Sequence, residues 1–164
     1  MSMGVESTIV SIQEDRLEIL RPGPITQEQL MKYGHVSSLA GIVNTPGGLP
    51  GHYAPKKKLH ILDSDIISFP PKTRVGFMAF HTSSKEIHNE ITAVEVLSAS
   101  GNLKEAAANF YGALRRLDES QAEVILAEPV PEEGIGVAIM DRLRRASYGS
   151  LHGTGHLSSN SPAR

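Results

Sequence analysis

Short apolar runs bounded by polar residues open the chain. Residues 7–12 read Ser-Thr-Ile-Val-Ser-Ile, and residues 17–20 form a second apolar run across a gap rich in Gln, Glu and Asp. Short runs rich in β-branched residues and separated by polar turns are typical of strands. The pattern therefore predicts a β-hairpin. A sharp turn follows at Pro22-Gly23-Pro24, because proline fixes φ and glycine permits positive φ.

The next two segments differ in their composition. Thr26, with Gln29 three positions later, gives a capping-box pattern that predicts a short helix. The hairpin and this helix, residues 1–33, form a unit too small to fold alone. Residues 34–58 are rich in Gly and Pro and predict an extended linker.

From Leu59 onward, strand and helix patterns alternate. Strands are predicted near residues 59–62, 74–80, 93–97 and 123–127, and helices over residues 103–118 and 135–147. The first helix carries an apolar stripe at three- and four-residue spacing, which predicts a core-facing side. Strands interleaved with helices indicate a layered α/β domain with a largely parallel sheet over residues 59–147. Residues 148–164 are predicted to be a flexible tail.

The composition is that of an ordinary globular protein. The chain has 164 residues, 40% of them hydrophobic and 21% charged, with a net charge of −2 and no cysteine. The lack of cysteine excludes disulfides and Cys-based zinc sites and fits a reducing compartment. We expect a cytoplasmic protein, because nothing in the sequence predicts export or a membrane span. The charge balance predicts no nucleic-acid-binding face, and the basic clusters at 56–58 and 142–145 are interpreted as structural or solubilising, the second in the last turn of its helix.

The hairpin carries the best candidate for ligand chemistry. Arg21 leaves the second strand at a stiff turn, and Ser7 and Thr8 begin the partner strand. A fixed guanidinium beside two hydroxyls is suited to binding phosphate or carboxylate. The alternative is a solvated arginine with two ordinary strand hydroxyls, and spacing alone favours that alternative.

Two other candidates are weaker. The Gly134-Ile135-Gly136 turn precedes a predicted helix and could present N–H groups to an anion. It lacks the dinucleotide-binding fingerprint, and Glu132 and Glu133 would repel phosphate, so a structural tight turn is favoured. His81 follows a predicted strand, where doubly wound sheets place ligand-facing residues, but a loop hydrogen bond is the favoured interpretation. The spacing of the seven histidines predicts no metal site.

Four segments in this order resemble the two-domain form of the threonylcarbamoyl-AMP synthase family. They are the strand at 6–12, the Arg-Pro-Gly turn at 21–26, the His-Tyr-Ala-Pro stretch at 52–55, and the segment 124–143. The resemblance extends over residues 4–147. It implies that residues 1–33 are the end of a YrdC-like catalytic domain, that residues 34–58 are the interdomain linker, and that residues 59–147 are a Rossmann-like C-terminal domain.

The family resemblance implies a function for the parent enzyme. Such enzymes condense ATP, L-threonine and bicarbonate into threonylcarbamoyl-AMP and pyrophosphate, with magnesium, for the N6-threonylcarbamoyladenosine modification of tRNA. By resemblance Ser7, Thr8 and Arg21 are nucleotide-binding positions, Thr8 being the weaker, and His52 and Tyr53 are linker residues that gate the site. The family's K-x-R and S-x-N motifs should precede Ser7. We therefore expect a C-terminal regulatory portion of the synthase that is inactive alone.

The sequence departs from the family pattern at three places. Ser11 and Ile12 replace the usual acidic strand end, the linker lacks two usual basic residues, and Asp141 stands where asparagine is common. A different hypothesis is a stand-alone α/β regulatory module that binds a nucleotide or a protein. The hairpin edges would then dock to a YrdC-like catalytic domain or mediate self-association. An independent Rossmann-type enzyme is disfavoured, because no convergent acid, base or nucleophile set is evident.

Overall fold

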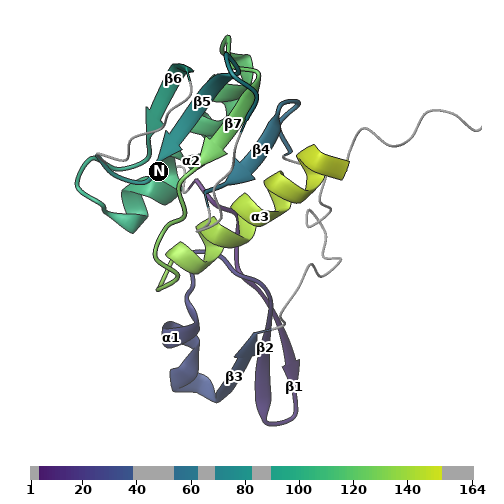
Figure 1. Ribbon diagram of the computed structural model, residues 1–164. Coiled ribbons are helices and arrows are strands. Elements are labelled where there is room, and N and C mark those ends of the chain that lie inside the picture. The colour runs from purple at the N-terminus through teal and green to yellow at the C-terminus, as the bar shows by residue number, and fades with distance from the viewer. Residues whose placement is uncertain (1–3, 39–53, 63–68, 83–89, 153–164) are drawn as a thin grey trace, which may run out of the picture.

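The computed structural model describes residues 4–38, 54–62, 69–82 and 90–152. It contains two sheets, which lie at opposite ends of the molecule, and the N-terminal end of helix α3 lies near the smaller one (Figure 1). The α/β fold with a parallel sheet that the sequence predicts is confirmed. Among the residues described, no helix is long and apolar enough to cross a membrane.

The smaller sheet has the order β1-β2-β3 and contains the predicted hairpin. Strands β1 (Ile9–Gln13) and β2 (Arg16–Arg21) are antiparallel, with a register shift between Ile9 and Val10. The predicted short helix is α1 (Gln27–Leu30), and a 3-10 turn at Met31–Tyr33 continues it. Both hydrogen bonds of the capping box between Thr26 and Gln29 are present. We call residues 7–38 the arm.

Strand β3 (His35–Ser38) lies within the segment that the sequence predicts to be an extended linker. It pairs in parallel with β2, and Val36 lies opposite Leu17. The edge of β2 would otherwise leave its backbone groups unpaired, and β3 supplies their partners. Residues 39–53 of the predicted linker are outside the described ranges.

The larger sheet is parallel and has the strand order β4-β7-β5-β6. Its strands are β4 (Lys58–Ile61), β5 (Arg74–Ala79), β6 (Glu90–Val96) and β7 (Val124–Ala127). Helices α2 (Leu103–Glu119) and α3 (Gly136–His152) share one buried cluster with one face of this sheet. Alternate residues of β5 point to the opposite face, where they form a second, smaller cluster.

Helix α3 continues to His152, whereas the sequence predicts an end at residue 147. The added turns are held by hydroxyl groups. The Ser147 hydroxyl donates to the Leu59 carbonyl at 2.9 Å, and the Ser150 hydroxyl accepts from the Leu59 N–H at 2.9 Å. Residues 148–152 of the predicted tail are therefore helical, and the basic cluster at 142–145 lies within the helix and not in its last turn.

The chain before β1 packs against the α/β layers. Val5 is 3% exposed and belongs to the main core cluster. A Cβ on Gly4 would lie 1.8 Å from the Ala107 carbonyl oxygen, so the backbone contacts α2 directly. The segment that leads into the hairpin is thus fixed to the C-terminal domain.

Lys57 fastens the start of β4 to the end of α2. Its ammonium donates to the carbonyls of Leu117 at 3.3 Å and Ser120 at 2.8 Å, and also to that of Asp118. The backbone N–H groups of Lys56 and Lys57 donate in return to the Asp118 carboxylate at 3.2 and 3.0 Å. A cation at a helix C-terminus satisfies carbonyls that lack helical partners. Lys57 of the basic cluster at 56–58 therefore has a structural role.

Candidate functional site

The structure brings Ser7 and Arg21 into direct contact. The Arg21 guanidinium donates to the Ser7 carbonyl through Nε at 3.2 Å and Nη2 at 3.0 Å, and Nη2 also lies 3.2 Å from the Ser7 hydroxyl. Arg21 is 7% exposed. The hairpin register, which pairs Ile9 with Arg21, places the start of one strand beside the end of the other. The closeness expected from the sequence is therefore present, with the guanidinium held against the backbone of the neighbouring strand.

Thr8 follows Ser7, and its hydroxyl is hydrogen-bonded to the backbone just after the Arg-Pro-Gly turn. Its hydroxyl donates to the Ile25 carbonyl at 2.8 Å and accepts from the Ile25 N–H at 3.0 Å. A Cβ on Gly23 would lie 2.4 Å from the Thr8 nitrogen and 2.6 Å from the Glu6 carbonyl oxygen. Glycine at position 23 thus permits a close approach of the turn to the strand. Thr8 fixes the Arg-Pro-Gly turn beside Ser7.

This arrangement is suited to binding an anion. The planar fork of an arginine can bind phosphate or carboxylate oxygens while a neighbouring hydroxyl donates, and here Nε and Nη2 already donate to the Ser7 carbonyl. Within the described ranges, no group of three or more His, Asp or Glu side chains could hold a metal ion. His52 and Tyr53, the linker residues expected to gate the site, lie outside the described residues.

A partly buried ionic network includes Glu6, the residue that precedes Ser7. The Arg142 Nε donates to Glu6 Oε2 at 2.8 Å, and the Tyr111 hydroxyl lies 3.3 and 3.4 Å from the two oxygens of the same carboxylate. Asp141 contacts Arg142 and accepts from Arg145 Nε at 3.0 Å. Burial acts to lower the pKa of Arg142, but the hydrogen bond to Glu6 and the charge of Asp141 outweigh it, so this pKa is raised.

The sequence does not reveal this network. Glu6 and Arg142 are 136 positions apart, and Tyr111 comes from a third segment. The one available signal is the charge of Arg142, whose neighbours one turn away on the helix, Ile139 and Ala146, are buried. A cation among buried positions of a helix requires a partner.

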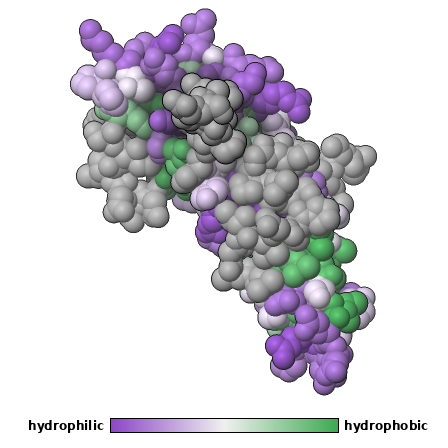
Figure 2. Space-filling view, turned by 90° about the vertical axis from the view of Figure 1, so that its right-hand side faces the viewer, coloured by the Kyte–Doolittle hydropathy of each residue, from purple (hydrophilic) through white to green (hydrophobic). Residues whose placement is uncertain are grey.

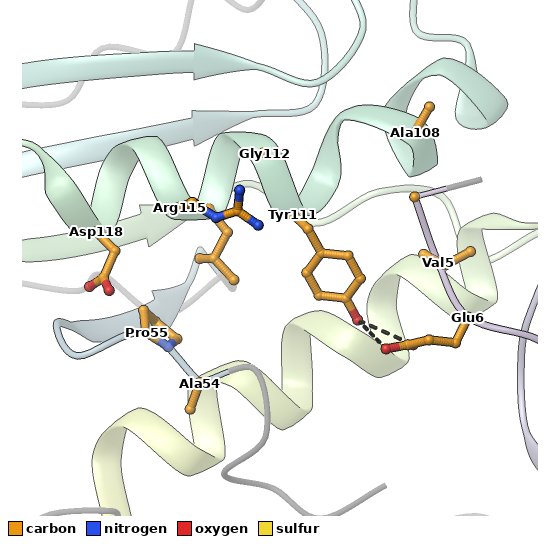
Figure 3. A pocket seen from close by; sticks show the side chains of 11 residues that line it. Val5, Glu6, Ala54, Pro55, Ala108, Tyr111, Gly112, Arg115 and Asp118 are labelled. Carbon is orange, nitrogen blue, oxygen red and sulfur yellow. Dashed lines mark hydrogen bonds between the residues drawn. The ribbon is translucent and has the colours of Figure 1, made fainter. Parts of the chain in front are cut away.

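A cleft of about 590 Å³ adjoins the network between the N-terminal segment and α2. Figure 3 shows Tyr111 and Glu6 hydrogen-bonded at one end, Asp118 and Pro55 at the other, and Arg115 between them. Pro55 belongs to the last part of the predicted linker, residues 34–58. The cleft therefore lies where the linker reaches the C-terminal domain.

The Gly134 turn is structural, as the sequence favours. Gly134 has a φ of 51°, and a Cβ on Gly136 would lie 1.9 Å from the Pro131 carbonyl oxygen. The Gly136 N–H donates to the Glu133 carbonyl at 2.9 Å, and the Val137 N–H donates to the Gly134 carbonyl at 3.4 Å. The first N–H groups of α3 thus already have partners within the turn.

His81 makes the loop contact that the sequence favours. Its Nδ1 lies 3.1 Å from the Thr82 carbonyl oxygen, and its ring packs edge-on against Phe80 with 5.6 Å between centroids. The ring is exposed. These contacts are those of a histidine that orders its own loop.

His60 predicts a pH dependence of stability. Burial, and then the charge of Lys58, lowers the pKa of His60 below its usual value of 6.5. The unfolded chain therefore binds a proton at His60 more readily than the folded chain does. The contribution of neutral His60 to the free energy of unfolding is fully present above pH 6.5, and it is lost as pH falls through the lower pKa that His60 has in the folded chain. We expect His60→Gln to flatten the melting temperature against pH over this window. Equal slopes for His60→Gln and the unaltered chain between pH 5 and 7 would contradict this.

Residues 25–147 match the family described as threonylcarbamoyl-AMP synthase, C-terminal domain. The threonylcarbamoyl-AMP synthase of Pyrococcus abyssi is 32% identical over 157 residues, covering 88% of this chain and 46% of that protein. The Bacillus subtilis enzyme of the same name is 31% identical over 168 residues, covering 91% of this chain and 47% of its own length. This chain thus spans about half the length of the curated relatives it matches.

Solved structures of P. abyssi Sua5 have a similar fold over most of this chain. P. abyssi Sua5 complexed with L-threonine superposes with a TM-score of 0.63 at 26% identity, covering 90% of this chain and 47% of that one. A variant of the same protein, with an adjacent histidine and tyrosine both changed to alanine, gives a TM-score of 0.66 at 26% identity and covers 90% and 46%. The fold and the sequence therefore point to the same relatives.

Proposed function

Because this chain belongs to the threonylcarbamoyl-AMP synthase family through its C-terminal domain, we propose that it is the C-terminal regulatory portion of an L-threonylcarbamoyladenylate synthase. The complete enzyme, a nucleotidyltransferase, would convert ATP, L-threonine and bicarbonate into threonylcarbamoyl-AMP and pyrophosphate for tRNA modification in the cytoplasm. This chain would not catalyse the reaction alone. It would act with a YrdC-like catalytic domain that supplies the remaining contacts to ATP and threonine.

One observation carries the proposal: Arg21 contacts both the carbonyl and the hydroxyl of Ser7. These are the two positions at which the family resemblance places nucleotide contacts. In the complete pocket Arg21 would neutralise phosphate charge and Ser7 would donate its hydroxyl, while Thr8 would keep the turn in place. ATP would bring magnesium with it. We assign no magnesium ligand to this chain, since its described residues contain no group of three or more His, Asp or Glu side chains that could hold a metal ion.

His52 and Tyr53 are proposed to gate the site. They form the one adjacent His-Tyr pair in the sequence, and a solved P. abyssi variant replaces such a pair with alanine. Ala54 and Pro55, which follow this pair directly, line the cleft beside Glu6. A linker anchored at this point could pass from the C-terminal domain to the nucleotide and cover it.

The arm has the surface expected of a segment that docks to the catalytic domain. Its exposed large apolar side chains include Ile12 at 76%, Tyr33 at 73% and Met31 at 60%. Figure 2 shows apolar side chains on the projecting end of the molecule, among polar ones. Ile12 is on β1 and Tyr33 on the 3-10 turn, and the two line the same hollow of the arm. Exposed apolar residues gathered on one part of a molecule are typical of a contact surface. Self-association through the arm is the competing outcome.

The proposal predicts that this chain strengthens ATP binding by a YrdC-like catalytic domain. Isothermal titration with ATP and magnesium, with and without L-threonine, would be made on the catalytic domain, on this chain, and on their mixture. We expect the mixture to bind ATP about tenfold more tightly than the catalytic domain alone, the effect of one charged hydrogen bond. We expect Arg21→Ala to remove that gain.

Arg16→Ala is the matched control, because Arg16 lies at the opposite end of the same strand and is exposed. It should leave the gain in affinity unchanged. Equal affinity of the Arg21→Ala and Arg16→Ala mixtures would contradict a nucleotide-binding role of Arg21. Saturable ATP binding by this chain alone would instead mean that the arm forms a nucleotide site without the catalytic domain.

A further inference from the structure

We infer that Glu6, Tyr111 and Arg142 form a positioning link through which the C-terminal domain holds the Ser7–Arg21 pair in place. The inference rests on the proposed function for the role of that pair. Through this link, a structural change in the C-terminal domain would alter the position of the Ser7–Arg21 pair.

The link joins three segments that are distant in sequence. Glu6 belongs to the N-terminal segment, Tyr111 to α2 and Arg142 to α3. Arg142 Nε and Glu6 Oε2 are 2.8 Å apart, and the Tyr111 hydroxyl lies 3.3 Å from the same oxygen. One carboxylate therefore receives hydrogen bonds from both helices of the C-terminal domain.

The ion pair of Arg142 with Glu6 is largely shielded from solvent. The Arg142 side chain is 5% exposed, and that of Glu6 is 26% exposed. Arg142 Nη1 contacts Asp141, Nη2 is buried without a hydrogen-bond partner in the structure, and Nε donates to Glu6, so the loss of Glu6 would leave Nε unpaired as well. A buried charge that loses its partner is strongly destabilising. The position of Glu6 is thus set by Arg142.

The backbone transmits this constraint to the site. Glu6 precedes Ser7, whose carbonyl accepts from Arg21 at 3.0 Å. The Glu6 carbonyl oxygen also lies against Gly23 of the turn, at 2.6 Å from the site of a Cβ. A shift of Glu6 would therefore move both the acceptor of Arg21 and the turn that follows Arg21.

Ordinary core packing does not replace this link. Val5 is buried in the main cluster and anchors the segment through apolar contacts. Hydrogen bonds are directional, whereas apolar contacts are not. Glu6 directly precedes Ser7, and its carboxylate is hydrogen-bonded to both α2 and α3. The link therefore orients Ser7 as well as anchoring the segment.

Coupling of this kind is reciprocal. If the C-terminal domain holds the Ser7–Arg21 pair, a ligand on that pair stabilises the contacts of α2 and α3 by the same free energy. A change in the C-terminal domain would in turn weaken nucleotide binding without touching the nucleotide. This is the regulation that we assign to the C-terminal portion.

Amide hydrogen exchange of the unaltered chain and the Glu6→Gln variant tests the link without a nucleotide. Glutamine keeps the shape of the side chain and loses the charge, so we expect the fold to persist. Exchange should rise about tenfold at amides in residues 7–11 and 19–24 and stay unchanged in β5 and β7, because local opening exposes only the held segments. Tyr111→Phe, which removes one hydroxyl, should produce a smaller rise at the same amides.

Glu95→Gln is the matched control, because Glu95 is 23% exposed, much as Glu6 is, and its ion pair with Arg116 joins β6 to α2. It should leave exchange in residues 7–24 unchanged. An unchanged pattern in Glu6→Gln, or an equal rise at all core amides, would overturn the inference.

A second readout separates this inference from the proposed function. In mixtures with a YrdC-like catalytic domain, Glu6→Gln should weaken ATP binding about tenfold, as Arg21→Ala does. If the unaltered chain gives no gain in ATP affinity, the proposed function fails, and hydrogen exchange still decides whether the link exists. If the gain is present and Glu6→Gln leaves it intact, the positioning role is wrong while the proposed function stands.

Discussion

Gly23→Ala is expected to separate the Arg-Pro-Gly turn from the strand that carries Ser7 and Thr8. The new Cβ would lie 2.4 Å from the Thr8 nitrogen, 2.6 Å from the Glu6 carbonyl oxygen and 2.7 Å from the Ser7 carbonyl carbon. All three are backbone atoms, so no side chain can rotate away. We expect a loss of about 3 kcal/mol in the free energy of unfolding, the upper part of the range for overpacking. Chemical denaturation measures this loss directly.

The same variant should also lose its effect on ATP binding, since the displaced turn takes Arg21 away from Ser7. Gly112→Ala is the matched control. Its Cβ would lie 3.2 Å from the end of the flexible Arg116 side chain, which can move away. In a helix interior, alanine is more favourable than glycine by about 1 kcal/mol in free energy. We expect this variant to be as stable as the unaltered chain or slightly more so. Equal stabilities of the two alanine variants would contradict the close approach at Gly23.

Phe110→Ala is expected to be the most destabilising single change in the C-terminal domain. The ring is fully buried in the cluster between the parallel sheet and its two helices, and it packs edge-on against Tyr111 with 5.1 Å between centroids. Removing such a ring costs about 3–5 kcal/mol through lost transfer free energy and the cavity left behind. Urea denaturation followed by circular dichroism gives the change in the free energy of unfolding.

Tyr33→Ala provides the comparison for Phe110→Ala, because Tyr33 is an aromatic residue on the exposed side of the arm. We expect it to change stability by no more than about 0.5 kcal/mol. A loss of less than about 1 kcal/mol in Phe110→Ala would show that the ring is not a central core contact.

Local patterns were enough to predict much of this fold. The hairpin, the capped short helix and the two long helices follow from residue periodicity and capping residues. The contact of Ser7 with Arg21 also follows, because a hairpin places the start of one strand beside the end of the other. Whether this pair binds a nucleotide is not a question of periodicity, and that role stays a prediction.

The features that sequence reasoning missed depend on distant partners. Strand β3 has one half-buried apolar residue, Val36, and forms because β2 offers an unpaired edge. The last turns of α3 look polar, but their serines bind the backbone of β4. The Glu6–Arg142 ion pair joins residues 136 positions apart. No local pattern in the sequence specifies such pairings.

The central proposal is that this chain is inactive alone and acts together with a YrdC-like catalytic domain. The most direct test measures the release of pyrophosphate from ATP that depends on both L-threonine and bicarbonate. The assay would be run on this chain alone, on a YrdC-like catalytic domain alone, and on their mixture. We predict no turnover above background by this chain alone, and turnover by the mixture that falls in Arg21→Ala but not in Arg16→Ala. Turnover by this chain alone that is abolished in Arg21→Ala would contradict the account.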